Sequence, residues 1–252
     1  MKQRIILQDL GEMAYQQAWD YQESLLQQNV AIKSRAMNTV TSLTSDQAVP
    51  GGSLQVQPGE AESTTNYLLL VEHPPVYTLG KSGKQEHVLF NETEREERGI
   101  EFFRTNRGGD ITYHGPGQVV GYPIFDLENF FTDIGKYLRS LEEVIILTLE
   151  EYGLKGDRSP GETGVWLDPG ILGRERKICA MGVRCSRWIT MHGFALNVNT
   201  DLSYFNGIIP CGIQYKQVTS LEKELGQVVP IEEVKEKLKK NFAVVFDAVV
   251  VG

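Results

Sequence analysis

The sequence predicts a mixed α/β (α+β) domain in which strands and helices follow one another without regular alternation. The 3.6-residue spacing of apolar side chains in residues 132–152 predicts an amphipathic helix that ends at Gly153. Short apolar runs such as residues 67–72 are typical of buried strands, and prolines at 74 and 75 end that run. Because these elements do not form repeated strand–helix–strand units, the pattern favours mixed sheets flanked by helices over a doubly wound parallel sheet.

Two further helices are predicted at the ends of the chain. Residues 12–28 place Ala14, Ala18, Tyr21 and Leu25 on one helical face. A last helix is expected after Pro230, with Val234, Leu238, Phe242 and Val245 facing inward. Between these ends, further strands are predicted at residues 76–79, 101–105, 164–167, 177–184, 188–191 and 193–198.

Residues 29–66 differ in composition from the rest of the chain. They contain no aromatic residue, ten serines and threonines, and the turn sequences Pro50-Gly51-Gly52 and Pro58-Gly59. Such a segment has little to bury, so we expect a flexible surface insertion within a single domain spanning residues 1–252. A lid over a binding site is the functional alternative.

Composition limits the function classes. A chain of 252 residues with 41% hydrophobic residues can build its own core, and the net charge of −8 argues against a nucleic-acid binder. Three scattered cysteines and the absence of a CxxC pair indicate a reducing compartment and argue against a zinc site, so we expect no metal and no cofactor. The first ten residues do not resemble a signal peptide and no run reaches membrane-spanning length, which predicts a cytoplasmic protein and, by default, a monomer.

The most unusual segment is a glycine-rich loop at residues 107–118. It carries an arginine, a histidine, four glycines and a proline, and a buried strand is expected directly after it. Glycine lets the main chain approach a ligand closely, so the pattern predicts a binding loop, the alternative being an ordinary turn between strands. The candidate binding residues here are Arg107, Gly108, Gly109, Asp110, Ile111, Thr112, Tyr113 and His114.

Two strands and one loop carry the other candidates. Lys177 begins a strand of small and apolar residues; on its own such a lysine is usually a solvated edge residue. His192 precedes a glycine in an apolar strand and is most simply a hydrogen-bonded structural residue. Cys211 lies between a proline and a glycine, where a thiol is accessible, whereas Cys179 falls in an apolar run and is expected to be core. Lys177, His114 or His192 would each be able to activate a nucleophilic Cys211.

Together these segments resemble the LipB family of octanoyltransferases. The resemblance rests on the loop at 107–118, the strand at 177–182, the strand at 192–198 and the Ile209-Pro210-Cys211-Gly212 loop, which occur in the family's order and at similar separations. It covers most of the chain, to about Glu222, although residues 29–66 are longer than the short connection usual in the family.

The resemblance implies a fold, an activity and a set of roles. The fold would be that of the biotin and lipoate protein ligases. The activity would be transfer of an octanoyl group from octanoyl-acyl carrier protein to a lysine of lipoyl domains, such as those of 2-oxoacid dehydrogenases and the glycine cleavage H protein. Cys211 would carry the acyl thioester and Lys177 would lower its pKa. The acyl site would be lined by residues 107–114 and by Ala180, Met181, Gly182, Gly193, Phe194 and Ala195.

Three alternatives and one docking hypothesis accompany this interpretation. An ATP-dependent lipoate-protein ligase would share the fold without needing a nucleophilic cysteine. A non-catalytic binding protein and a cysteine hydrolase are more distant possibilities. Since the family's protein partners are acidic, the basic residues of segment 168–188 are expected to meet the carrier, unless they form an ordinary solvated loop; they are Arg174, Arg176, Lys177, Arg184 and Arg187.

Overall fold

A computed structural model describes residues 2–45 (side chains to residue 37), 62–209 and 217–252. Over these residues the chain forms two sheets. The larger sheet holds, in spatial order, β12 (Ala248–Val251), β1 (Gln3–Glu12), β2 (Asn66–Glu72), β6 (Gln118–Ile124), β10 (Ile189–Asn197), β9 (Arg176–Ser186), β8 (Glu162–Leu167) and β7 (Gly156–Ser159), with β11 (Gln217–Val218) beside β9. The smaller sheet has the order β4 (Glu101–Arg104), β3 (Val76–Leu79) and β5 (Ile111–His114).

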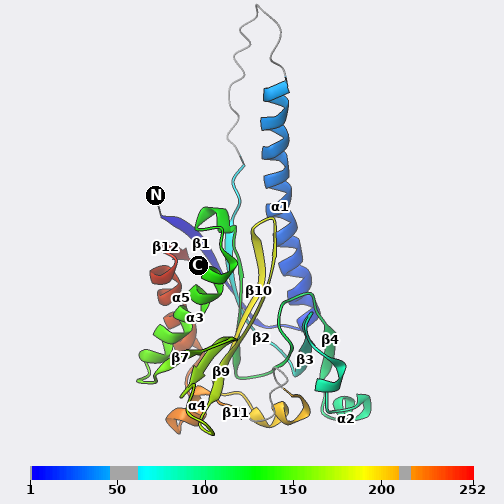
Figure 1. The fold of residues 1–252 in the computed structure, drawn as a ribbon, viewed down its shortest axis with the longest axis vertical. Coiled ribbons are helices and arrows are strands. Elements are labelled where there is room, and N and C mark those ends of the chain that lie inside the picture. Colours follow the sequence, from blue (N-terminus) through cyan, green and yellow to red (C-terminus); the bar gives the residue numbers. More distant parts are fainter. Residues whose placement is uncertain (1, 46–61, 210–216) are drawn as a thin grey trace, which may run out of the picture.

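Helices cover both faces of the larger sheet (Figure 1). The α-helices are α1 (Tyr15–Ser45), α2 (Glu92–Glu97), α3 (Ile134–Glu150), α4 (Leu221–Leu225) and α5 (Ile231–Val245). Short 3₁₀ turns are η1 (Gln85–His87), η2 (Leu127–Asn129) and η3 (Leu202–Gly207). Helix α1 packs on β6 and β10, whereas α3 and α5 pack together on the other side. The predicted fold class, mixed sheets flanked by helices, is therefore confirmed.

The apolar periodicity of α3 accounts for its position. Leu141, Ile145 and Leu149 are fully buried in the core between α3, α5 and the sheet. The helix begins after Asp133, whose carboxylate accepts a hydrogen bond of 2.9 Å from the amide of Lys136. Such an N-cap satisfies one of the free amides of the first turn. A second core, under α1, is separated from the first by the sheet.

Helix α1 is longer than the sequence predicts. It continues from Tyr15 to Ser45 instead of ending near residue 28, so the first part of the expected 29–66 insertion is helical. The reason is tertiary contact: both amide atoms of Asn29 hydrogen-bond the main chain of Thr65, at 2.8 and 2.9 Å. Local composition carries no sign of these contacts, and residues 46–61, in the middle of the expected insertion, lie outside the described residues.

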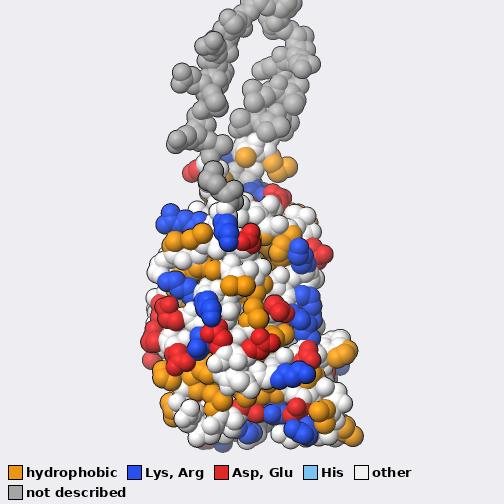
Figure 2. Space-filling model, turned by 90° about the vertical axis from the view of Figure 1, so that its left-hand side faces the viewer, with side chains coloured by type: hydrophobic (Ala, Val, Ile, Leu, Met, Phe, Trp, Pro, Cys, Tyr) orange, Lys and Arg blue, Asp and Glu red, His pale blue; other side chains and the backbone are white. Residues whose placement is uncertain are grey.

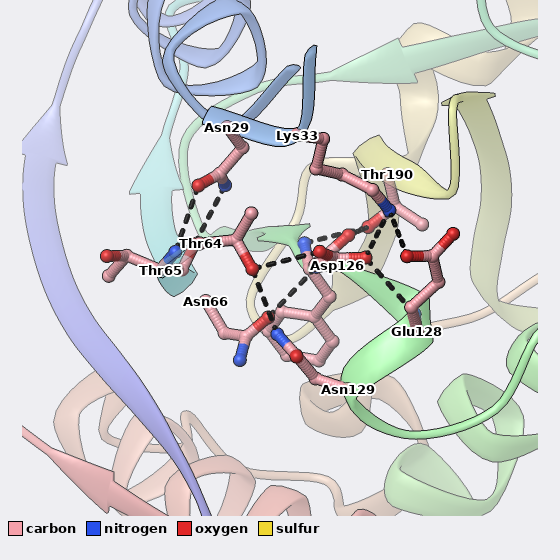
Figure 3. Close-up of polar contacts among 10 residues, drawn as sticks. Asn29, Lys33, Thr64, Thr65, Asn66, Asp126, Glu128, Asn129 and Thr190 are labelled. Carbon is pink, nitrogen blue, oxygen red and sulfur yellow. Dashed lines mark hydrogen bonds and ion pairs between the residues drawn. The ribbon is translucent and has the colours of Figure 1, made fainter. Parts of the chain in front are cut away.

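A buried carboxylate holds this part of α1 to the sheet (Figure 3). Asp126 follows β6, and its oxygens accept hydrogen bonds from Lys33 Nζ at 2.9 Å and Thr64 Oγ1 at 2.9 Å. Its own amide donates to Asn66 Oδ1. Lys33 also pairs with Glu128 at 2.8 Å, so the ammonium lies between two carboxylates. These contacts join α1, the segment before β2 and the end of β6.

The strands differ in two ways from the sequence-based assignment. Strands β1, β5, β7, β11 and β12 were not predicted; β1 and β12 pair in parallel at the edge of the larger sheet. The two runs at 188–191 and 193–198 form one strand, β10, across His192. His192 has a left-handed φ of 57°, and its amide donates to Gln22 of α1 at 2.9 Å. This hydrogen bond stabilises a conformation that non-glycine residues seldom adopt.

The outer surface over α3, α5 and β12 is charged and mixed. Lysine and arginine side chains alternate with aspartate and glutamate, and hydrophobic side chains are scattered among them (Figure 2). Within the described part of the chain, each helix is too short or too polar to cross a bilayer.

The Asp126 contacts yield a stability prediction. We expect Asp126→Ala to lower the free energy of unfolding by about 3 kcal/mol, because it removes the buried carboxylate that accepts from Lys33 and Thr64. Glu128→Ala is the matched control: the Glu128 side chain is 51% exposed, and its loss should cost less than about 1 kcal/mol. Urea unfolding measures both. Equal losses for the two variants would contradict a special role for the buried carboxylate.

Candidate active site

One large cavity lies where the smaller sheet meets the larger. Its volume is about 630 Å³. Residues of α1, β5, β6, β8, β9, β10 and α3 contribute to its walls, together with the glycine-rich loop. Such a volume is typical of a site for a small organic ligand.

The glycine-rich loop forms one wall and is held from two sides. Gly80 donates its amide to the carbonyl of Asp110 at 3.0 Å, from the turn after β3. On the other side, the amide of Gly108 donates to the carbonyl of Val183 in β9 at 2.9 Å. The loop is thus anchored by main-chain hydrogen bonds on two sides, to the turn after β3 and to β9.

A β-bulge turns Lys177 toward the cavity. Trp166 of β8 pairs with Lys177 and Val165 with Cys179, so Ile178 is an extra residue on β9. A bulge of this kind places two successive residues on one face of a strand. Ile178 and Cys179 are both in the core under α3, which leaves Lys177 on the cavity side. Ala180 then returns to the cavity, so the bulge brings Lys177 and Ala180 onto the same wall.

The Lys177 side chain is packed closely by β8. It is 7% exposed, and its Nζ lies 4.5 Å from the centre of the Trp166 ring. Lys177 Cε lies beside Gly164, where an added Cβ would be 3.6 Å from it. The same Cβ would clash with the Cys179 carbonyl, at 2.5 Å. Gly164 also has a φ of 119°, which side chains disfavour. Lys177 is therefore a buried residue of the site, not a solvated edge lysine.

His114 is fixed in a neutral form by its hydrogen bonds. Gln118 Nε2 donates to the Tyr113 carbonyl and to Asn197 Oδ1. Gln118 Oε1 therefore accepts a hydrogen bond from His114 Nδ1, at 2.8 Å. His114 Nε2 then accepts from Thr78 Oγ1 at 3.2 Å, and that hydroxyl accepts from Arg107 at 2.9 Å. Burial, followed by the neighbouring His73, holds the pKa of His114 well below its usual value. With its lone pair occupied, His114 is poorly suited to act as a base.

The same chain of hydrogen bonds continues to the backbone of Lys177. Gln118 Nε2 donates to Asn197 Oδ1 at 2.8 Å, and Asn197 Nδ2 donates to the carbonyl of Thr219 at 3.0 Å. The amide of Thr219 donates to the carbonyl of Lys177 at 2.9 Å. A continuous polar network thus connects the glycine-rich loop with β9, and it fixes the two walls relative to each other.

Two other buried histidines are also neutral at ordinary pH. His73 donates from Nδ1 to the carbonyl of Met13 and accepts from the Tyr122 hydroxyl at 2.8 Å; burial lowers its pKa to about 4. Burial, together with nearby arginines, lowers the pKa of His192 to about 3. His192 Nε2 hydrogen-bonds Asn106 at 2.7 Å. His192 is thus held by Asn106, and it also lines the cavity.

The cysteines fall into three positions. Cys179 is fully buried, and burial raises the pKa of its thiol, as expected of a core residue. Cys185 is partly exposed. Cys211 lies outside the described residues. The described residues on both sides of this segment are held by hydrogen bonds. The Ile209 amide donates to the His87 carbonyl at 2.8 Å. Strand β11, which begins at Gln217, pairs with β9 at Arg176 and Lys177.

Sequence comparison decides the family. The model of the lipoyl protein ligase A/B catalytic domain matches residues 14–243. An octanoyltransferase from Flavobacterium johnsoniae is 56% identical over 252 residues, covering 100% of both chains. Another from Christiangramia forsetii is 55% identical over 249 residues, covering 98% of each. The chain belongs to the octanoyltransferase family.

Solved structures support the fold assignment. A lipoate-protein ligase A bound with ATP superposes with a TM-score of 0.64 at 16% identity, covering 100% of this chain and 90% of that one. A bipartite lipoate protein ligase from Thermoplasma acidophilum gives 0.61 at 18% identity, covering 100% and 88%. At these identities the likeness shows the fold, which is that of the lipoate-protein ligases.

Most of the residues that the octanoyltransferase resemblance implies lie around one cavity. The cavity is lined by Arg107, Gly108, Gly109, Asp110, Ile111, Thr112, His114, Lys177, Ala180, Met181, Gly182, Gly193, Phe194 and Ala195. Tyr113 is the exception among the described candidates. Its ring stacks on Tyr204 with centroids 4.9 Å apart, in a separate cluster with Phe205. Thr112 and His114 lie on the face of β5 opposite to Tyr113. Ile111 lies at the start of β5, where it contacts the Tyr113 cluster and also lines the cavity.

Several other cavity residues were not singled out from the sequence. They are Tyr15, Ser82, Val120, Tyr122, Ile134, Leu138, Gly161, Glu162, Thr163, Phe205 and Val218. They come from elements distant in the sequence and carry no motif. Ile134 and Leu138 lie in the helix predicted at 132–152, and only the tertiary arrangement places them at a cavity.

The basic segment at 168–188 is largely neutralised. Arg176 pairs with Glu224 at 2.6 Å and with Asp168 at 2.6 Å, and Arg174 pairs with Asp168 at 3.0 Å. Arg184 pairs with Glu23 of α1 at 2.7 Å. These arginines serve first to join elements of the fold, which weakens the hypothesis that they form a positive docking rim.

The close approach of the glycine-rich loop to β9 predicts a difference between two glycines. A Cβ at Gly182 would lie 2.5 Å from the carbonyl of Gly108, which is backbone and cannot swing away, whereas a Cβ at Gly108 would meet ordinary contact at 3.4 Å. We expect Gly182→Ala to reduce octanoyl transfer about tenfold or more, by displacing the loop, and Gly108→Ala to reduce it much less. Steady-state rates on folded protein measure this; similar losses would contradict it.

The buried histidines predict acid sensitivity. An unfolded histidine titrates near pH 6.5, but folded His73 binds its proton only near pH 4. Between these values the unfolded chain binds more protons, so stability falls as the pH decreases through this window. Urea unfolding at about pH 7 and about pH 5 should show this loss, and the loss should be smaller in His73→Gln. The same pH dependence in the variant would assign the effect to other groups.

Proposed function

We propose that this protein transfers an octanoyl group from octanoyl-acyl carrier protein to a lysine of lipoyl domains, through a thioester on Cys211. The full-length identity of 55–56% to octanoyltransferases carries the proposal. The arrangement of the site supports it, because a buried lysine faces a largely apolar cavity lined by the glycine-rich loop.

In the first half-reaction the Cys211 thiolate attacks the carbonyl carbon of the carrier-bound thioester. A free cysteine has a pKa of about 8.5, so a neighbouring ammonium increases the thiolate fraction near neutral pH. The Lys177 ammonium fills this role. When the tetrahedral intermediate collapses, the carrier sulfur leaves and takes its proton from Lys177, which becomes a neutral amine. Main-chain amides of the glycine-rich segments are the donors for the transient oxyanion.

In the second half-reaction the amine of the acceptor lysine attacks the Cys211 thioester. The Cys211 sulfur leaves as a thiolate, and the attacking nitrogen loses a proton to the neutral Lys177. The product is an amide, and Lys177 and Cys211 return to their starting charges. One lysine thus serves as acid in the first step and base in the second.

An ATP-dependent lipoate-protein ligase remains the alternative on the same fold. A solved ligase with bound ATP shares the architecture at 16% identity, which is a likeness of fold alone. The higher, full-length identity to octanoyltransferases favours transfer. Product formation from octanoyl-acyl carrier protein without ATP separates the two: a strict ATP requirement would support the ligase.

The proposed acceptors are the lipoyl domains of 2-oxoacid dehydrogenases and the glycine cleavage H protein. Transfer to either kind of acceptor requires no cofactor on the transferase. We further propose that the enzyme acts as a monomer in the cytoplasm.

Intact mass spectrometry tests the covalent intermediate. After mixing with octanoyl-acyl carrier protein, the wild-type chain should gain one octanoyl group, and Cys211→Ala should gain none, because the acyl acceptor is removed. Lys177→Ala should load about a hundredfold more slowly at neutral pH, since the thiolate fraction and the proton donor are lost.

Cys185 provides the control. Cys185→Ser should load like wild type, because its thiol lies outside the cavity lining. A wild-type chain that forms octanoylated lipoyl domain without ever carrying the adduct would contradict the thioester mechanism.

A further inference from the structure

A carboxylate is completely buried behind the wall that carries Lys177. Glu142 of α3 has no exposed surface, on a helix face otherwise occupied by apolar residues. Its Oε2 pairs with Arg139 at 2.7 Å and with Arg158 at 3.0 Å. Its Oε1 accepts a hydrogen bond of 3.0 Å from the amide of Gly164 in β8. The carboxylate thus connects α3 to the strand that contacts Lys177.

Stability alone is a weak reason for this arrangement. Removing a carboxylate and guanidinium from water costs several kcal/mol, and apolar side chains of similar volume often stabilise a fold equally well. Arg139 is half-exposed and Arg158 one-third exposed, which limits the strength of their pairing with Glu142. The hydrogen bond to Gly164 is the part that lies fully inside the protein.

Gly164 is the contact point between this carboxylate and the site. A Cβ at Gly164 would lie 2.5 Å from the Cys179 carbonyl of β9 and in ordinary contact with Lys177 Cε, at 3.6 Å. Two residues further along β8, the Trp166 ring lies 4.5 Å from Lys177 Nζ. The bulge on β9 also begins at the Trp166–Lys177 pair. Any shift of β8 at Gly164 therefore moves both surfaces that hold the lysine.

We propose that Glu142 is a positioning residue for the reaction: by holding the Gly164 amide, its carboxylate fixes β8 and so sets the place of the Lys177 ammonium. Glu142 does not line the cavity, so it acts through Lys177 and touches no substrate. The proposal rests on the function of Lys177 proposed above.

Two conservative substitutions of Glu142 separate the effect of side-chain length from the effect of charge. Glu142→Gln keeps the length and an oxygen that can accept from Gly164, and should load octanoyl groups onto Cys211 within a few-fold of the wild-type rate. Glu142→Asp keeps the charge but is one methylene shorter, and should load about 10- to 100-fold more slowly, as expected for a misplaced catalytic group. The reverse order would overturn the proposal, because it would make charge and not position the property that matters.

A double-mutant cycle tests whether Glu142 acts through Lys177. Single-turnover loading is measured by intact mass for wild type, Glu142→Asp, Lys177→Ala and the double variant. If Glu142 only places Lys177, the Asp substitution has no further effect once Lys177 is absent, whereas independent effects multiply. The pH at which loading is half-maximal should also rise in Glu142→Asp, as in Lys177→Ala. Multiplying effects or an unchanged pH profile would overturn the proposal.

Glu143→Ala is the matched control. Glu143 is the next residue, pairs with the same Arg158 at 2.6 Å and does not contact Gly164. It should load at the wild-type rate; a loss equal to that of Glu142→Asp would assign the effect to Arg158 and overturn the role of Gly164. Failure of the wild-type chain to load would instead refute the proposed function, whereas normal loading in wild type and in Glu142→Asp would refute this inference alone.

Discussion

The site depends on keeping one ammonium group buried at a fixed point beside an apolar cavity. Lys177 Nζ lies over the Trp166 ring and Cε lies beside Gly164, and the one-residue bulge at Ile178 turns the side chain away from the core. Without the bulge, regular alternation would not place Lys177 on the same wall as Ala180, three residues later. The local irregularity of β9 is therefore what converts a strand lysine into a group of the site.

The other polar groups near the cavity support this lysine by being neutral and fixed. His73, His114 and His192 all have a pKa held low by burial, and the hydrogen bonds of His114 occupy both ring nitrogens. In the mechanism proposed above, proton transfer is therefore assigned to Lys177. The hydrogen-bond network that runs from Arg107 to Thr219 has a mechanical role, since it joins the glycine-rich loop to the β9 backbone.

Sequence reasoning found those parts of the site that have a local chemical signature. The glycine-rich loop was recognisable because close backbone contact requires glycine. Lys177 was recognisable only because the strand at 177–182 resembles that of the octanoyltransferase family. Tyr15 and Thr163 were not recognisable, because only the packing of α1 and β8 brings them to the cavity. The true length of α1 was hidden for a related reason: contacts of Asn29 and Lys33 with residues far along the chain stabilise a segment of helix-neutral composition.

In the proposed mechanism the Lys177 ammonium makes the Cys211 thiol reactive. Alkylation of Cys211 in the absence of substrate measures this effect. The rate of iodoacetamide modification of Cys211 is followed against pH by peptide mass spectrometry, in a Cys185→Ser chain with Lys177 or Met at position 177. The account predicts a Cys211 pKa below about 8.5 with Lys177 and a clearly higher value in Lys177→Met, where the charge is lost. The same pKa in both chains would contradict it.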